Sequence, residues 1–114
     1  PLTDETKGMI NADTLAQLPQ GASVINAGRG EQIVDEDLLA ALDSGHIQYA
    51  ILDVFKDEPL SESHPYWTHP RVHITPHIAS ITRNDTAGDR LAENLLRWHQ
   101  GEPMMGEVDK QRGY

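Results

Sequence analysis

The chain has 114 residues, a net charge of −9 at neutral pH and no cysteine. This length allows one domain, or part of one, with a buried core, and the lack of thiols excludes disulfides and thiolate metal sites. The cationic residues are scattered, so no nucleic-acid partner is predicted, because phosphate binding needs a basic stripe. No apolar run approaches the roughly 20 residues of a membrane span, and we expect a cytoplasmic protein without a membrane partner.

The amino-terminal part of the chain predicts one short helix and one strand. Asn11 is a favoured N-cap residue, and the helix predicted at 11–18 stops before Pro19, because proline does not continue a helix. Residues 22–26 (ASVIN) follow as a short run of apolar and β-branched side chains. Such a run is typical of a buried strand.

The clearest helix of the sequence comes next, at residues 35–45 (DEDLLAALDSG). Its acidic first turn suits the positive end of a helix dipole, Asp35 is the expected cap, and Gly45 stands where a C′ glycine ends a helix. Residues 50–55 (AILDVF) then predict a strand that contains Asp53. A carboxylate is costly to bury without a partner, so Asp53 is either a satisfied structural group or a functional one.

The last predicted strand, residues 72–75 (VHIT), alternates in polarity, and the last predicted helix, 82–99, has an apolar stripe that includes Leu91 and Leu95. Between the second and third strands, residues 56–71 contain three prolines and show no helical period. Long connections of this kind inside a domain are usually functional or disordered.

Strands that alternate with helices predict an α/β fold of about three parallel strands with flanking helices, since parallel neighbours need a crossover. Open parallel sheets bind ligands outside the carboxyl ends of their strands. Arg29 follows the first strand between two glycines, and His77 follows the third. Asp53 and Glu58 come from the end of the second strand. We therefore expect a guanidinium, two carboxylates and an imidazole at one edge of the sheet.

These residue types together suit the reduction of a 2-keto acid. A carboxylate beside an imidazole favours the protonated imidazole, which can deliver its proton in a transition state. Arginine binds a carboxylate through two parallel hydrogen bonds. No side chain supplies hydride, so this reaction requires a nicotinamide cofactor.

Two hydrolase alternatives are weaker. His64, His69, His73 and His77 lie close together in the sequence, and imidazole binds zinc well, so a metal-dependent hydrolase is one alternative. Their irregular spacing and the prolines between them disfavour a shared metal, and no metal site is predicted. A serine hydrolase is not indicated, because the chain has no G-x-S-x-G elbow.

The segments NAGRG, LDVFKDEP and PHIAS, in this order, resemble the carboxy-terminal half of the NAD(P)-dependent D-2-hydroxyacid dehydrogenases. The stretch HPYWTHPRVHITPHIAS and the terminal RGY resemble most the glyoxylate/hydroxypyruvate reductase A branch of that family. The resemblance implies the second half of a Rossmann-type NAD(P)-binding domain at 1–82, and at 83–114 a helix and tail that return toward a substrate domain. Since the pyrophosphate fingerprint G-x-G-x-x-G is not found, we expect part of a longer protein, inactive by itself.

The resemblance also implies roles for single residues. Arg29 matches the arginine that holds the substrate carboxylate, Glu58 the glutamate that pairs with the histidine, and His77 the proton donor. Asp53 matches a carboxylate near the nicotinamide carboxamide. The implied cofactor, NADPH or NADH, would be bound by Pro1, Leu2, Thr6, Ala27, Gly28, Arg29, Asp53, His77, Ile78, Ala79 and Ser80.

The implied partners are a small 2-keto or 2-hydroxy acid and a second copy in a homodimer of the longer protein. Glycine is common in the family at the position of Ala79, so we expect altered packing against the cofactor there. Some relatives with this fold are nucleotide-sensing co-repressors that keep a similar set of residues. A nucleotide-binding protein without enzymatic activity is therefore the first alternative to the enzyme, ahead of the metal-dependent hydrolase.

Overall fold

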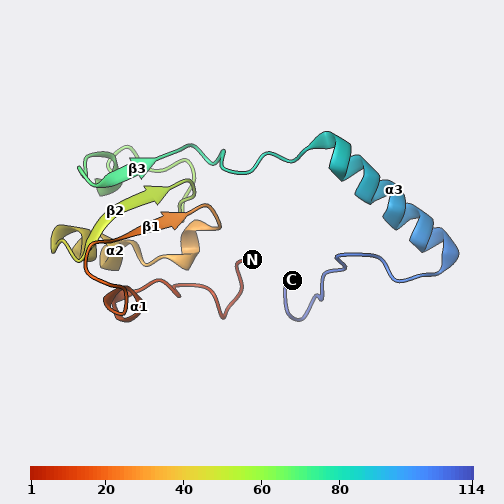
Figure 1. Cartoon of the computed structure of the whole chain (residues 1–114), viewed down its shortest axis with the longest axis horizontal. Helices are drawn as coiled ribbons and strands as arrows, with labels where there is room; N and C mark the ends of the chain where they lie inside the picture. The colour runs from red at the N-terminus through yellow and green to blue at the C-terminus, as the bar shows by residue number, and fades with distance from the viewer. The chain divides into compact units, whose positions relative to one another are not determined.

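The computed structural model describes residues 1–114, which form two compact units, Pro1–Ala79 and Ser80–Tyr114. The first unit contains one sheet, whose strands lie in the order β1, β2, β3 and are all parallel (Figure 1). The strands are β1 (Ala22–Asn26), β2 (Ile47–Leu52) and β3 (Val72–Ile74). The α/β fold with three parallel strands is thereby confirmed.

One helix packs on a face of this sheet, and a second helix packs against the first. Helix α2 (Asp35–Asp43) lies against β2, and the short helix α1 (Ala12–Ala16) lies against α2. Leu38 and Leu42 of α2 are fully buried, as expected for an amphipathic helix that turns its apolar stripe toward a sheet. They belong to one core cluster, which also includes Leu15, Val24, Ile33, Ile47, Ala50, Leu52 and Tyr66.

The two faces of the sheet differ because successive strand residues point to opposite sides. Val24 and Ala50 are paired neighbours on the helix side, and both are buried. On the opposite side, Ile25 pairs with Ile51 and is 69% exposed, and Tyr49 is also exposed. Within the first unit, helices therefore cover one face of the sheet only.

The helix ends show which local signals were reliable. The Asn11 side chain accepts hydrogen bonds from two backbone N–H groups of α1, and Gly45 follows α2 with φ +77°, so both predictions are confirmed. The prediction that Asp35 caps α2 is wrong. Val34 holds the cap position without a side-chain bond, and the Asp35 carboxylate accepts the Tyr66 hydroxyl at 2.9 Å instead. A long-range partner replaces the local one.

The limits of the second strand also differ from the prediction of 50–55. Strand β2 begins at Ile47, which pairs with Ala22 of β1, and ends before Asp53. Gln48 and Tyr49 are exposed on the strand, and their polarity hid its first half from a search for apolar runs. Asp53 is therefore not inside the strand but directly after it.

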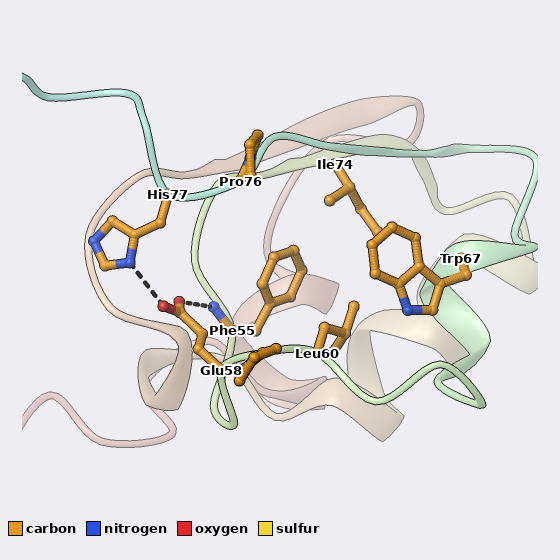
Figure 2. Close-up of a pocket in the computed structure, with 8 residues that line it drawn as sticks. Phe55, Glu58, Leu60, Trp67, Ile74, Pro76 and His77 are labelled. Carbon is orange, nitrogen blue, oxygen red and sulfur yellow. Dashed lines mark hydrogen bonds and ion pairs between the residues drawn. The ribbon is translucent and has the colours of Figure 1, made fainter.

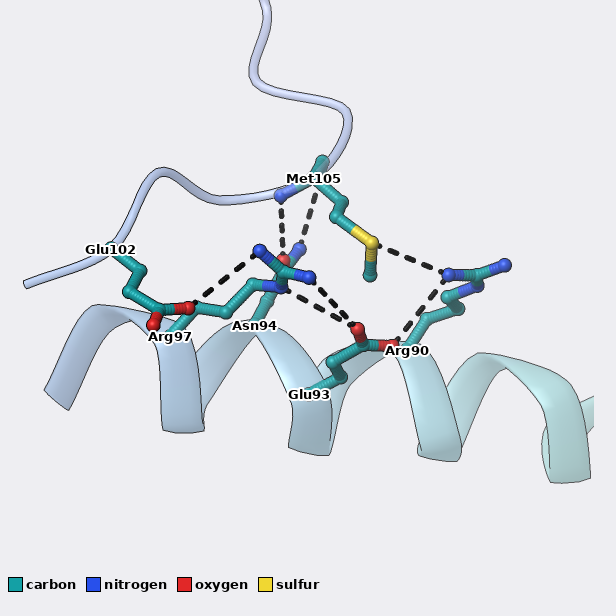
Figure 3. A network of polar contacts seen from close by, with 6 residues as sticks. All are labelled: Arg90, Glu93, Asn94, Arg97, Glu102 and Met105. Atoms are coloured by element: carbon teal, nitrogen blue, oxygen red, sulfur yellow. Dashed lines mark hydrogen bonds and ion pairs between the residues drawn. The ribbon is translucent and has the colours of Figure 1, made fainter. Parts of the chain in front are cut away.

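The second unit consists of helix α3 (Asn84–Gln100) and a tail that folds back along it. The Asn94 amide binds the backbone of Met105 through two hydrogen bonds of 2.8 and 3.0 Å, and Glu93 pairs with both Arg90 and Arg97 (Figure 3). No residue of α3 is buried. No helix in the structure is both long and apolar enough to cross a membrane.

The compact division falls between Ala79 and Ser80. The assignment of 1–82 to a nucleotide-binding half and of 83–114 to a returning helix and tail stays a prediction.

Candidate active site

The backbone hydrogen bonds of the sheet continue past the ends of the strands. The N–H of Asp53 donates to the carbonyl oxygen of Asn26 at 2.9 Å, and the N–H of His77 donates to the carbonyl oxygen of Asp53, also at 2.9 Å. Parallel strands end at the same edge, and these two bonds hold the three following segments together there. Asn26, Asp53 and His77 thus lie in one row, although they are far apart in the sequence.

Asp53 anchors the segment that carries His77. Its side chain is buried, with 4% of the residue exposed, and its carboxylate accepts hydrogen bonds from the Thr75 hydroxyl and from the N–H groups of Ile78 (2.9 Å) and Ala79 (3.0 Å). The Thr75 hydroxyl, helped by these N–H groups, holds the pKa of the Asp53 carboxyl below its ordinary value, although burial works in the other direction. A charged carboxylate therefore fixes residues 75–79 onto the end of β2.

His77 adopts an uncommon backbone conformation. Its φ of +53° lies in the left-handed region, which residues other than glycine rarely occupy, and such strain persists only where the surroundings impose it. Here the surroundings are the bonds to Asp53 on both sides of the residue. They direct the imidazole away from the end of β3 and toward Glu58 (Figure 2).

The imidazole of His77 and the carboxylate of Glu58 form a hydrogen-bonded pair. His77 Nδ1 lies 2.8 Å from Glu58 Oε2, while Glu58 Oε1 accepts the N–H of Phe55 at 2.9 Å (Figure 2). His77 first, and the Phe55 N–H second, hold the pKa of the Glu58 carboxyl below its ordinary value. An ionised Glu58 orients the ring, so Nε2 of His77 is the nitrogen available to another molecule.

Arg29 and His77 line the same cavity, of about 220 Å³. Glu58 and Leu2 also line it, as does Lys56, a second cation that the sequence analysis missed although it stands next to the quoted acidic residues. Residues 27–30, the arginine loop, approach this wall closely, since a Cβ at Gly30 would lie 1.9 Å from the carbonyl carbon of Phe55. Only glycine permits that approach. Cationic and imidazole groups from separate strand ends therefore meet around one small cavity.

A larger apolar hollow of about 480 Å³ shares Phe55, Glu58 and His77 with that cavity (Figure 2). Much of its wall comes from the proline-containing connection between β2 and β3, which is ordered and includes the single turn Pro65–Trp67. The hollow is lined by Phe55, Glu58, Pro59, Leu60, Trp67, Ile74, Pro76 and His77. The hollow therefore offers an apolar surface beside the histidine–glutamate pair, whose own side chains are partly exposed.

The remaining residues expected to bind a cofactor fall into three groups. The first group is the amino-terminal segment: Leu2 lies in the wall of the Arg29 cavity, and the Thr6 hydroxyl donates to the carbonyl oxygen of Pro1 at 3.0 Å. The second group is Ser80 alone, the first residue of the second unit. The third group, Ala27, Gly28, Ile78 and Ala79, is exposed after the strand ends. Ala27, Gly28 and Ala79 are small, and their part in binding a cofactor stays a prediction.

The histidines do not gather into a metal site. No three histidine, aspartate or glutamate side chains form a group that could hold a metal ion. Two other histidines instead lie singly beside carboxylates, His64 at 3.6 Å from Asp35 and His69 at 3.1 Å from Asp43. These pairs are separate from the pair at His77.

A parallel sheet with these residues at its carboxyl edge defines the second half of a Rossmann-type nucleotide-binding domain, of the class found in dehydrogenases. The sequence model of the family described as "D-isomer specific 2-hydroxyacid dehydrogenase, NAD binding domain" matches residues 1–79. The chain belongs to this family.

Known proteins are similar to this chain along its whole length. It is 53% identical over 114 residues to glyoxylate/hydroxypyruvate reductase A of Klebsiella pneumoniae, and it spans 36% of the length of that relative. A D-isomer specific 2-hydroxyacid dehydrogenase from Xanthobacter autotrophicus, solved with NADPH and MES, is 49% identical with a TM-score of 0.94; the match covers 100% of this chain and 47% of that one.

A second solved structure is similar in the same way. The NADPH-dependent glyoxylate/hydroxypyruvate reductase of Sinorhizobium meliloti, solved with NADP and sulfate, is 42% identical with a TM-score of 0.89. The match covers 100% of this chain and 38% of that one.

Proposed function

We propose that this chain supplies the proton donor and the nicotinamide side of the cofactor site of an NAD(P)H-dependent reductase of 2-keto acids such as glyoxylate and hydroxypyruvate. The reaction is proposed for a protein as long as its relatives, with this chain inactive by itself. The observation that carries the proposal is the cavity where Arg29 meets the His77–Glu58 pair. The names of the relatives support the substrate class, and the NADPH and NADP in the two solved neighbours support the cofactor.

Each side chain has a distinct task in this proposal. The bound dinucleotide would supply the hydride that reduces the keto carbon. Arg29 binds the substrate carboxylate through two parallel hydrogen bonds. His77 holds a proton at Nε2 and gives it to the keto oxygen as that oxygen gains negative charge. Glu58 accepts the Nδ1–H and stabilises the imidazolium before transfer. One hydride and one proton convert the keto acid into a 2-hydroxy acid.

The cofactor would lie along the exposed strand ends. We propose that Ala27, Gly28, Ile78, Ala79 and Ser80 flank the nicotinamide, that Asp53 lies near its carboxamide, and that Pro1, Leu2 and Thr6 close the other side. The division into a nucleotide-binding half at 1–82 and a returning helix and tail at 83–114 belongs to the same proposal. So does a homodimer of the longer protein.

The test is turnover of glyoxylate by the full-length protein, followed as loss of NADPH absorbance. Arg29→Ala should raise KM for glyoxylate about a hundredfold, since it removes two hydrogen bonds to a charged group. Arg112→Ala, at an exposed arginine of the tail, is the matched control and should leave KM unchanged.

Two other results would overturn the proposal. If the protein shows no turnover with any small 2-keto acid but binds NADPH tightly, it is a nucleotide-sensing protein. If the protein holds zinc and has a hydrolytic activity that is lost on chelation of the metal, it is a metal-dependent hydrolase.

A further inference from the structure

The backbone of the arginine loop, residues 27–30, is held by the amide side chains of Asn26 and Gln32, which no sequence motif indicated. Asn26 is buried, with 6% exposed. Its Oδ1 accepts the N–H of Gly28 and its Nδ2 donates to the carbonyl oxygen of Arg29, each at 3.0 Å. Gln32 Oε1 accepts the N–H of Arg29 at 3.1 Å. Both backbone polar groups of Arg29 are thus bound by amides.

The same loop is packed tightly on two sides. A Cβ at Gly28 would lie 2.6 Å from Gln32 Oε1, so the glutamine amide fills the space beside that glycine. At Gly30 the backbone of Phe55 blocks any side chain. The loop cannot shift without breaking an amide hydrogen bond or moving the chain after β2.

We propose that Asn26 and Gln32 are positioning residues for the substrate carboxylate. This inference rests on the proposed function, because it assigns the two amides to Arg29 in its role as the carboxylate-binding group. The arginine side chain has many rotatable bonds. Its two hydrogen bonds to the substrate carboxylate therefore form in the productive geometry only if the backbone of Arg29 stays fixed. Both amides act on the backbone of Arg29 and bind no substrate themselves.

The decisive comparison is between two variants of Gln32. Gln32→Leu removes the acceptor for the N–H of Arg29, whereas Gln32→Glu keeps an acceptor of the same length. In the full-length protein, Gln32→Leu should raise KM for glyoxylate about tenfold, the effect expected of one lost hydrogen bond. Its kcat and its affinity for NADPH should stay near those of the wild type, and Gln32→Glu should restore KM.

Asn26→Asp tests the other amide. It keeps the acceptor for the N–H of Gly28 but replaces the donor to Arg29 with a second oxygen, which repels the carbonyl oxygen 3.0 Å away. KM for glyoxylate should rise about tenfold or more, because an unpaired buried polar group costs more than a lost hydrogen bond. Gln48→Leu, at an exposed glutamine of β2, is the matched control and should change neither KM nor kcat.

A second measurement separates this inference from the proposed function. Amide hydrogen exchange at Gly28 and Arg29 should be slow in the wild type, faster at Gly28 in Asn26→Ala and faster at Arg29 in Gln32→Leu. If wild-type turnover is absent, the proposed function fails, and exchange alone decides whether the amides fix the loop. If turnover is present but the variants leave KM and exchange unchanged, the positioning role is overturned while the proposed function stands.

Discussion

The two units of this chain are stabilised in different ways. In Pro1–Ala79, Leu38, Leu42 and Ile47 are fully buried around a sheet, whereas no residue of α3 in the second unit is buried. The hydrogen bonds of the site join distant residues, such as His77 and Glu58, 19 positions apart. The second unit relies on shorter links, such as the 11 positions between Asn94 and Met105.

This contrast shows where functional geometry comes from. Two residues that follow different strands, such as Glu58 and His77, come within 3 Å of each other only when the core beneath those strands is packed. A helix with a folded-back tail can form from local polar contacts, each of which contributes little. Chemistry that needs several groups at defined distances is therefore expected in the first unit, and four predictions test this difference.

The largest effect should come from His77→Ala. Removal of a general acid typically lowers the rate 10²- to 10⁴-fold, so kcat for glyoxylate in the full-length protein should fall within that range while NADPH binding persists. Steady-state kinetics and a nucleotide titration measure the two quantities. His73→Ala, at an exposed histidine of β3, is the control. Unchanged kcat in His77→Ala would remove this residue from the mechanism.

Leu38→Ala should destabilise the first unit strongly. The side chain is fully buried, and loss of a buried leucine costs about 2–5 kcal/mol of unfolding free energy. Leu95→Ala, at a residue of α3 that is 57% exposed, should change it by less than about 0.5 kcal/mol. Urea unfolding of this chain measures both variants. Equal losses would show that the two units do not differ in the proposed way.

Acid pH should destabilise the site, whereas pH changes near neutrality should leave its stability unchanged. The pKa values of Asp53 and Glu58 are both lowered by folding from ordinary values of 3.8 and 4.5. Their contribution to stability is therefore complete above those ordinary values and is lost as the pH falls through the lower folded ones.

Asp53→Asn tests that pH dependence. It should lower Tm by several degrees at neutral pH, because an amide nitrogen then faces a backbone N–H, and it should flatten the fall in Tm below pH 3.8, the ordinary pKa of the Asp53 carboxyl. Asp57→Asn is the control at an exposed carboxylate. A Tm profile with the same acid slope in wild type and Asp53→Asn would contradict the anchoring role of Asp53.

The smallest effect should come from Asn94→Ala in the second unit. The variant loses the two bonds to Met105, so amide exchange at Met105 should quicken about tenfold, as expected for a net loss near 1 kcal/mol. Exchange at His77 and Ile78 should stay the same. If exchange at His77 and Ile78 quickens as much as exchange at Met105, the site depends on the tail.

Much of the fold followed from local patterns. The three parallel strands, the Asn11 cap and the glycine after α2 were predicted, because periodicity and end signals are read from neighbouring residues. The exposed Gln48 and Tyr49 hid the start of β2, and the Asp35 cap failed because the Tyr66 hydroxyl, 31 positions away, binds that carboxylate. No local pattern indicated that the side-chain amides of Asn26 and Gln32 bind the arginine loop, since asparagine and glutamine are ordinary residues near a turn.

The sequence by itself determined which chemical groups follow each strand, because residue type and strand order are written in the chain. Only the tertiary structure decided how those groups pair: Asp53 with the backbone of residues 78 and 79, Glu58 with His77, and Asn26 with the arginine loop. A hydrogen bond acts over about 3 Å. Which distant groups come that close is set by the packing of the whole sheet and its helices, and no short stretch of the sequence contains that information.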